Sequence, residues 1–226
     1  LGVYNYIRKY YPDVDVRLYL EPIPNIFKFL NFSSEIRSDY EESVVFDLFI
    51  AMDCGDEKRL GNAARYFQEA KHTACIDHHV SNQSFAEENH IFPDASSTCE
   101  LICELLDTEK ITKEIAECLY TGMVTDTGVF QYSSTSSETM RIAGELMKTG
   151  FNFSKIIDES FYQKTYVQNQ VMGRVLAESI LLLDGKCIIG YLKKRDMEFY
   201  GVDGKDLDGI VSQLRLTAGV EVGMFI

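Results

Sequence analysis

One segment, residues 44–52, constrains the fold more than any other part of this sequence. It reads Val-Val-Phe-Asp-Leu-Phe-Ile-Ala-Met, an almost continuous apolar run that is typical of a strand buried on both faces of a parallel sheet. Around it, strand-like and helix-like patterns alternate. Further strands are predicted over 14–20 and 72–76, and helices over 60–70, 97–106, 112–124 and 136–149. This alternation predicts an α/β domain over residues 1–150, with a parallel sheet and helices on both faces.

The pattern changes after Gly150. Residues 151–179 are polar and helical without a clear strand, and we interpret them as a helical linker. Two apolar runs then flank Asp184-Gly185, a pair that is typical of a β-hairpin turn. A helix over 205–216 and a strand over 220–226 follow. Residues 180–226 are therefore expected to form the start of a smaller α+β domain.

Charge and cysteine content limit the classes of partner. The 226 residues include 35 acidic and 22 basic side chains, a net charge of −13, which disfavours non-specific binding to long nucleic acid. A small phosphorylated substrate remains compatible with this charge where metal cations supply the positive charge. The six cysteines form no C-x-x-C pair, and no apolar run reaches membrane-spanning length. We therefore expect a soluble cytoplasmic protein with reduced thiols.

Acidic and histidine side chains follow the predicted strands. Asp53 comes directly after the 44–52 strand, and Asp77-His78-His79 follows the 72–76 strand. Asp126 lies between two threonines further along the chain and is placed at a third strand end. Ligands of open parallel sheets bind beyond the carboxyl ends of the strands, so these side chains are expected to meet at one edge. Carboxylate and imidazole together form a ligand set for Mn²⁺ or a similar divalent ion.

Each of these residues also has an ordinary structural explanation. An aspartate after a strand, such as Asp53, often caps a helix or a turn, and Asp126 could cap a loop in the same way. Two adjacent histidines can occur on a surface without any role. The Asp77-His78-His79 triplet is harder to explain in this way because it follows an apolar strand directly.

Four stretches carry a resemblance to a known family. They are Ala51–Gly61, Cys75–His79 with Asn82, Phe92–Glu100 and Gly122–Phe130. In this order and at these separations they resemble the motifs of the DHH phosphoesterase family, within its branch of nanoRNases and pAp phosphatases. Residues 206–222 look like the start of the family's C-terminal substrate-binding domain.

The resemblance implies an activity and roles for individual residues. It implies a manganese-dependent phosphoesterase that cleaves short oligoribonucleotides or small nucleotides such as pAp by attack of a hydroxide shared between two Mn²⁺ ions. Asp53 resembles the carboxylate that bridges both ions, and His78 and Asp126 resemble ligands of one ion. His79 resembles the residue that faces the scissile phosphate, and Asp77 is expected to orient a neighbouring imidazole.

Other features of the site leave alternatives open. Arg59 is a candidate for substrate binding, although a structural ion pair is the favoured interpretation. Ser96, Ser97 and Thr98 could offer hydroxyl and amide groups to a phosphate, whereas a capping box explains Ser97 and Glu100 equally well.

Two parts of the family pattern are missing from this sequence. The family's first motif is expected just before Leu1, and its glycine-rich C-terminal motif just after Ile226. Pro12-Asp13-Val14-Asp15 imitates the first motif, but the first histidine of the chain is His72. We therefore expect this chain by itself to hold half of a two-metal site and to be impaired as an enzyme.

The alternative functions are a linear or cyclic dinucleotide phosphodiesterase and, in a different class, a catalytically dead nucleotide-binding module. The expected partner is a short RNA or a small nucleotide, with neither long duplex nucleic acid nor a membrane. The sequence leaves the oligomeric state open, and a homodimer is one of the alternatives.

Overall fold

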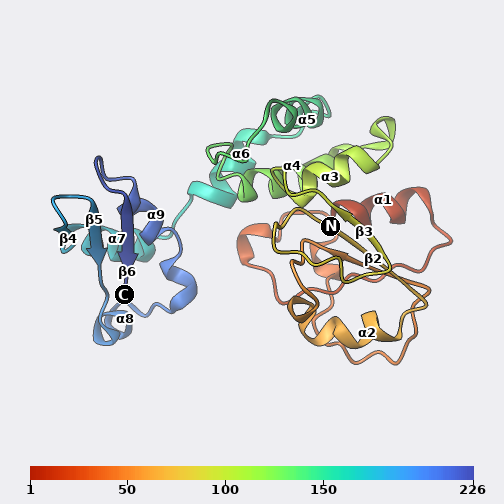
Figure 1. Ribbon diagram of the computed structural model, residues 1–226, viewed down its shortest axis with the longest axis horizontal. Coiled ribbons are helices and arrows are strands. Elements are labelled where there is room, and N and C mark those ends of the chain that lie inside the picture. Colours follow the sequence, from red (N-terminus) through yellow and green to blue (C-terminus); the bar gives the residue numbers. More distant parts are fainter. The chain divides into compact units, whose positions relative to one another are not determined.

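A three-stranded parallel sheet organises the first part of the chain (Figure 1). The computed structural model describes residues 1–226. The strands are β1 (Leu48–Met52), β2 (His72–Asp77) and β3 (Glu88–Ile91), with β2 in the centre. Met52 is paired with Ile76, and Asp77 with Ile91, so the carboxyl ends of all three strands reach the same edge of the sheet.

Helices cover both faces of this sheet, as the alternating pattern predicted. On one face, α3 (Thr98–Leu105) and α4 (Lys113–Asp126) form the main core, which Met52 and Ile76 join from the sheet. On the other face lies α2 (Ala64–Glu69), whose Phe67 ring packs edge-on against Phe49 of β1. The remaining helices of this unit pack around α4: α1 (Gly2–Tyr10), α5 (Ser137–Met147) and α6 (Phe153–Ile157).

The predicted helices over 97–106, 112–124 and 136–149 are confirmed, and two of them, α3 and α5, begin at local capping residues. Ser97 caps α3, with its hydroxyl accepting from the Glu100 amide. Ser136 and Thr139 form a reciprocal capping box at the start of α5. α5 ends at Met147, and Gly150, three residues further on, takes a left-handed φ of 83° that an L side chain rarely adopts.

Three local predictions in this unit are wrong. Residues 14–20 form no strand, since their only ladder contact is an isolated bridge between Tyr19 and Arg37. The 44–52 strand begins only at Leu48, lies at the sheet edge and is not buried on both faces, since Leu48 is 52% exposed. The helix over 60–70 is broken by Gly61 (φ 53°), so a 3₁₀ segment, Glu57–Ala63, precedes α2.

Contacts divide the chain into two units, Leu1–Tyr162 and Gln163–Ile226. Within the helical stretch 151–179, α6 and the π-helical turn Asp158–Tyr162 belong to the first unit, and α7 (Tyr166–Ala177) belongs to the second. None of the helices has both the length and the apolar character needed to cross a membrane.

The second unit is a small mixed sheet covered by helices. The predicted hairpin is present: β4 (Ile180–Leu182) runs antiparallel to β5 (Cys187–Gly190), which pairs in parallel with β6 (Val222–Phe225). Val171 of α7 and Leu214 of α9 (Ile210–Arg215) are fully buried against β5. The helix predicted over 205–216 is interrupted at Gly209 (φ 88°), which separates a 3₁₀ turn, Gly204–Leu207, from α9. An additional helix, α8 (Lys194–Tyr200), follows β5.

The crossing of α3 and α4 gives a first prediction. A Cβ atom added at Gly122 would lie 2.3 Å from Cys99 Sγ, so this crossing requires a glycine. Gly122→Val is expected to lower the free energy of unfolding by about 3 kcal/mol, because forced overpacking costs that much in well-packed cores. Urea unfolding followed by circular dichroism measures it.

Gly144 in α5 supplies the matched control, because nothing lies within 4 Å of a Cβ atom added there. Gly144→Ala is expected to raise the free energy of unfolding by roughly 0.5–1 kcal/mol, the usual gain for this change inside a helix. Equal unfolding midpoints for Gly122→Val and the wild type would contradict the packing assigned to this crossing.

Candidate metal centre

Asp53, His78 and His79 are brought together by the parallel pairing of β1 and β2. Asp53 is the first residue after β1, and its amide donates to the Ile76 carbonyl at 3.0 Å. Its φ of 60° is left-handed, a conformation that turns the chain sharply at the strand end. Donor atoms of Asp53, His78 and His79 all lie within 4.8 Å of one another. The predicted convergence of these three residues at the sheet edge is therefore observed.

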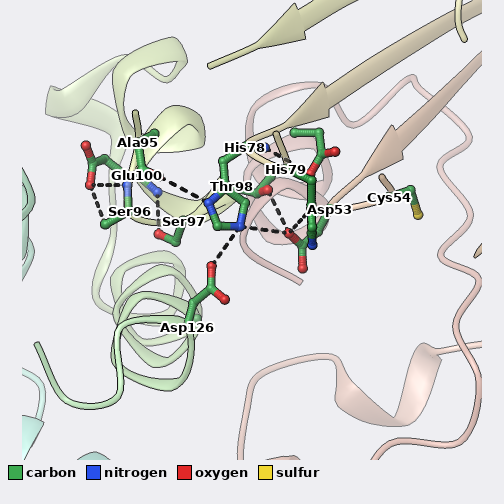
Figure 2. A network of polar contacts seen from close by, with 12 residues as sticks. Asp53, Cys54, His78, His79, Ala95, Ser96, Ser97, Thr98, Glu100 and Asp126 are labelled. Carbon is green, nitrogen blue, oxygen red and sulfur yellow. Dashed lines mark hydrogen bonds and ion pairs between the residues drawn. The ribbon is translucent and has the colours of Figure 1, made fainter. Parts of the chain in front are cut away.

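His78 is the centre of this group (Figure 2). Its Nδ1 lies 3.1 Å from the Ala95 carbonyl oxygen, and because a carbonyl only accepts, Nδ1 carries a hydrogen. Nε2 is thereby directed at two carboxylates, at 3.1 Å from Asp126 Oδ2 and 3.6 Å from Asp53 Oδ1. The hydrogen bond with Asp126 raises the pKa of His78 to about 9. The proton on Nε2 occupies the position that a divalent cation would take, since a metal competes with a proton for this nitrogen.

Asp126 reaches the site from a helix. We placed it at a strand end, and this was wrong, because Asp126 is the last residue of α4. The carbonyl end of a helix carries partial negative charge, which favours a cation beside it. Directly after Asp126 the chain reverses through three left-handed residues, Gly128 to Phe130, with φ between 57° and 63°. Val129 is strained in this conformation, and such strain is concentrated at functional sites.

His79 is held by a buried carboxylate. Asp77 is 0% exposed and accepts hydrogen bonds from His79 Nδ1 at 2.7 Å, from Asn82 Nδ2 at 2.7 Å and from the His78 amide at 2.9 Å. Burial alone would raise the pKa of Asp77, but the hydrogen bonds from Asn82 and His79 outweigh it and the pKa lies below its usual value. An ionised Asp77 therefore fixes His79 with Nδ1 as donor, and leaves Nε2 of His79 free to interact elsewhere.

Sequence reasoning missed the contact that holds Asp53. Thr98 Oγ1 donates to Asp53 Oδ1 at 2.9 Å, although the two residues are 45 positions apart. The predicted capping box is only half formed: Ser97 Oγ accepts from the Glu100 amide, but the Glu100 carboxylate turns to Ser96 and Thr139 instead. Only the closeness of Thr98 to the start of α3 hinted at a role in the site.

Arg59 is exposed in the 3₁₀ segment that follows Asp53, and it makes no ion pair with a carboxylate within 4 Å. The structural ion pair that we favoured for Arg59 is therefore absent.

The donor set fits a divalent transition metal. The ligand candidates are two carboxylates, Asp53 and Asp126, and one imidazole whose tautomer is already fixed, His78. Mixed oxygen and imidazole donors suit Mn²⁺ and its neighbours better than Mg²⁺ or Ca²⁺. The side chains of Asp53 and Asp126 are 56% and 38% exposed, so the site is open to solvent.

Comparison with known proteins relates this geometry to a family. The model of the DHH family N-terminal domain matches residues 1–123. A bifunctional oligoribonuclease and PAP phosphatase, NrnA of Bacillus subtilis (strain 168), is 26% identical over 99% of this chain and 71% of its own length. The NrnA of Thermus thermophilus is 27% identical over 90% of this chain, but the match spans only 60% of that relative.

Among solved structures, an exopolyphosphatase-related protein from Bacteroides fragilis superposes with a TM-score of 0.86 at 26% identity. The match covers 96% of this chain and 67% of that chain. The arrangement of strands and helices described above is therefore shared with a solved relative.

Proposed function

This chain belongs to the DHH family, as its four motifs predicted, and we propose that the full-length protein is a Mn²⁺-dependent phosphoesterase that hydrolyses short oligoribonucleotides and small nucleotides such as pAp. The observation that carries the proposal is the pair of carboxylates, from Asp53 and Asp126, on either side of a single imidazole nitrogen of His78. The names of the NrnA relatives support the substrate class. The net charge of −13 favours short substrates, because an acidic protein binds the backbone of a long polyanion weakly.

Asp53, His78 and Asp126 are the residues that would hold metal. Bound divalent ions supply a nucleophile at neutral pH and neutralise charge on the phosphate. The family resemblance assigns the role shared between two ions to Asp53, whose Oδ1 lies 3.6 Å from Nε2 of His78, the nitrogen proposed to bind one of them. Asp126 and His78 then serve one ion.

His79 is the residue assigned to the substrate, and Asp77 is the residue that orients His79. With Nδ1 engaged by Asp77, the Nε2 of His79 is free to donate a proton to the phosphate or to the leaving oxygen. Asp77 stabilises the positive charge on His79 while that proton is held, and it keeps the ring in place between turnovers.

The six cysteines are all unpaired, which supports action in the reducing cytoplasm.

Replacing His79 tests this assignment. His79→Gln is expected to lower kcat on a five-nucleotide RNA by roughly 10²–10⁴-fold, the usual contribution of a positioned acid. Its Kd for Mn²⁺ is expected to stay within about twofold of wild type, because His79 is assigned no ligand role. His72→Gln is the control, since His72 is exposed at the start of β2 and the one polar partner of its ring is Glu87. Wild-type kcat in His79→Gln would refute the role.

A substrate panel separates the proposed activity from its alternatives. The full-length protein with Mn²⁺ is expected to cleave RNA of two to five nucleotides and pAp faster than a cyclic dinucleotide or a long single strand. Preference for the cyclic dinucleotide would indicate the related phosphodiesterases. Binding of all four substrates without turnover would indicate a nucleotide-binding module.

A further inference from the structure

Glu100 in α3 is a buried carboxylate that the chemistry above does not use. Glu100 is only 5% exposed, and its carboxylate has no cationic partner within 4 Å. One oxygen, Oε2, accepts from Ser96 Oγ at 2.5 Å, from the Ser96 amide at 3.3 Å and from Thr139 Oγ1 at 2.7 Å. Burying a carboxylate without a cation is unfavourable unless such donors compensate it. A merely apolar packing position would be filled more stably by a hydrocarbon side chain.

The donors to Glu100 belong to a short segment beside the metal centre, residues 95–98, which joins the end of β3 to α3. The whole segment is buried, with Ser96 at 1% exposure. From one end its Ala95 carbonyl accepts from His78 Nδ1, and from the other its Thr98 hydroxyl donates to Asp53 Oδ1 (Figure 2). The 95–98 segment therefore contacts two of the three proposed ligands.

Thr139 ties this arrangement to α5. Its hydroxyl is fully buried, accepts from the Ser136 amide at 3.0 Å and gives its single proton to Glu100. Ser96 likewise donates its only hydroxyl proton to the same oxygen. Glu100 thus joins the capping box of α5 to the 95–98 segment through one acceptor atom, and no neutral alkyl side chain can replace it there.

We propose that Glu100 is a positioning residue: it fixes the 95–98 segment, and through the Ala95 carbonyl and the Thr98 hydroxyl it orients His78 and Asp53 for metal. The proposal rests on the proposed function, since it concerns the same metal centre. Groups that orient metal ligands in this way typically change metal affinity about 10–100-fold when they are removed.

Metal affinity, measured apart from hydrolysis, tests the proposal. The purified protein is titrated with Mn²⁺ while electron paramagnetic resonance records the free ion, at a temperature where every variant is folded by circular dichroism. Glu100→Ala is expected to raise the Kd for Mn²⁺ about 10–100-fold. Glu100→Gln, which keeps one carbonyl acceptor for Ser96 and Thr139, is expected to show a smaller rise than Glu100→Ala.

Two variants of Thr98 and one control variant keep the test decisive if Glu100→Ala does not fold. Thr98→Val removes the hydrogen bond to Asp53 at nearly constant volume and is expected to raise the Kd for Mn²⁺ about tenfold. Thr98→Ser keeps the hydroxyl, and its Kd for Mn²⁺ is expected to equal that of wild type. Leu146→Ala is the matched control: Leu146 is a buried core residue of α5, so its loss lowers stability without touching the 95–98 segment. Its Kd is expected to equal that of wild type.

The outcomes separate the two proposals. Unchanged Kd values in Glu100→Gln and Thr98→Val, with a wild type that binds Mn²⁺ and cleaves RNA, would overturn the positioning role and leave the proposed function intact. A Kd that rises equally in Leu146→Ala would also overturn it, because the effect would then follow stability alone. A wild type that binds no Mn²⁺ would overturn both proposals.

Discussion

Asp53→Asn is expected to lower the rate of cleavage of a five-nucleotide RNA by about 10³-fold or more. The carboxylate of Asp53 is the group assigned to both ions, and metal ions supply several kcal/mol of stabilisation to the charge that develops during phosphate hydrolysis. Asparagine is the informative replacement because it tolerates the left-handed φ of 60° at this position. The folded structure is therefore expected to persist while the negative charge is lost.

The measurement is kcat with saturating Mn²⁺, together with the urea midpoint of each protein. Asp47→Asn is the control, because Asp47 lies just before β1 at its opposite end and pairs only with the exposed Lys71. Its kcat is expected to match wild type. Near-normal cleavage by Asp53→Asn would refute the assignment of Asp53 to the metal centre.

Removal of divalent metal is expected to have an equally large effect. Dialysis against a chelator should reduce hydrolysis of short RNA and pAp by about 10³-fold or more, because without metal the site holds only protonated His78 between two carboxylates and has no activated nucleophile. Added Mn²⁺ should restore the rate, and Mg²⁺ or Ca²⁺ should restore less of it, since an imidazole ligand disfavours these harder ions.

Initial rates after stepwise addition of each ion measure this prediction. Circular dichroism of the metal-free protein serves as the control, because a lost fold would also abolish activity. Full activity in the chelator-treated protein, with metal content verified by elemental analysis, would contradict the metal-dependent account.

The sequence predicted well those parts of the fold that local interactions determine. The starts of α3 and α5 depend on capping residues a few positions away, Ser97 and Ser136, and both lie where they were predicted. The segment 44–52 shows the opposite case. Its apolar run indicates a strand, but whether that strand is central or at an edge depends on its neighbours, and the structure places β1 at the edge with Leu48 exposed.

Some residues of the candidate site could be predicted from the sequence in the same way, and others could not. Asp53 and the Asp77–His79 triplet could be placed together from strand pairing alone, because parallel strands end at one edge. Asp126 lies at the end of α4, so the pattern of strands placed it wrongly at a strand end, whereas the family resemblance indicated its role independently of that placement. Thr98 and Glu100 act across separations of 45 and 39 residues, which only tertiary packing establishes.

Anomalous diffraction from crystals soaked in MnCl₂ is the most direct test of the central claim, that Asp53, His78 and Asp126 bind metal. Data collected on both sides of the manganese absorption edge locate Mn²⁺ without reference to activity. The account predicts an anomalous peak within coordination distance of His78 Nε2 and of carboxylate oxygens of Asp53 and Asp126. A crystal that shows no peak at His78 under saturating Mn²⁺, or peaks only elsewhere on the surface, would contradict it.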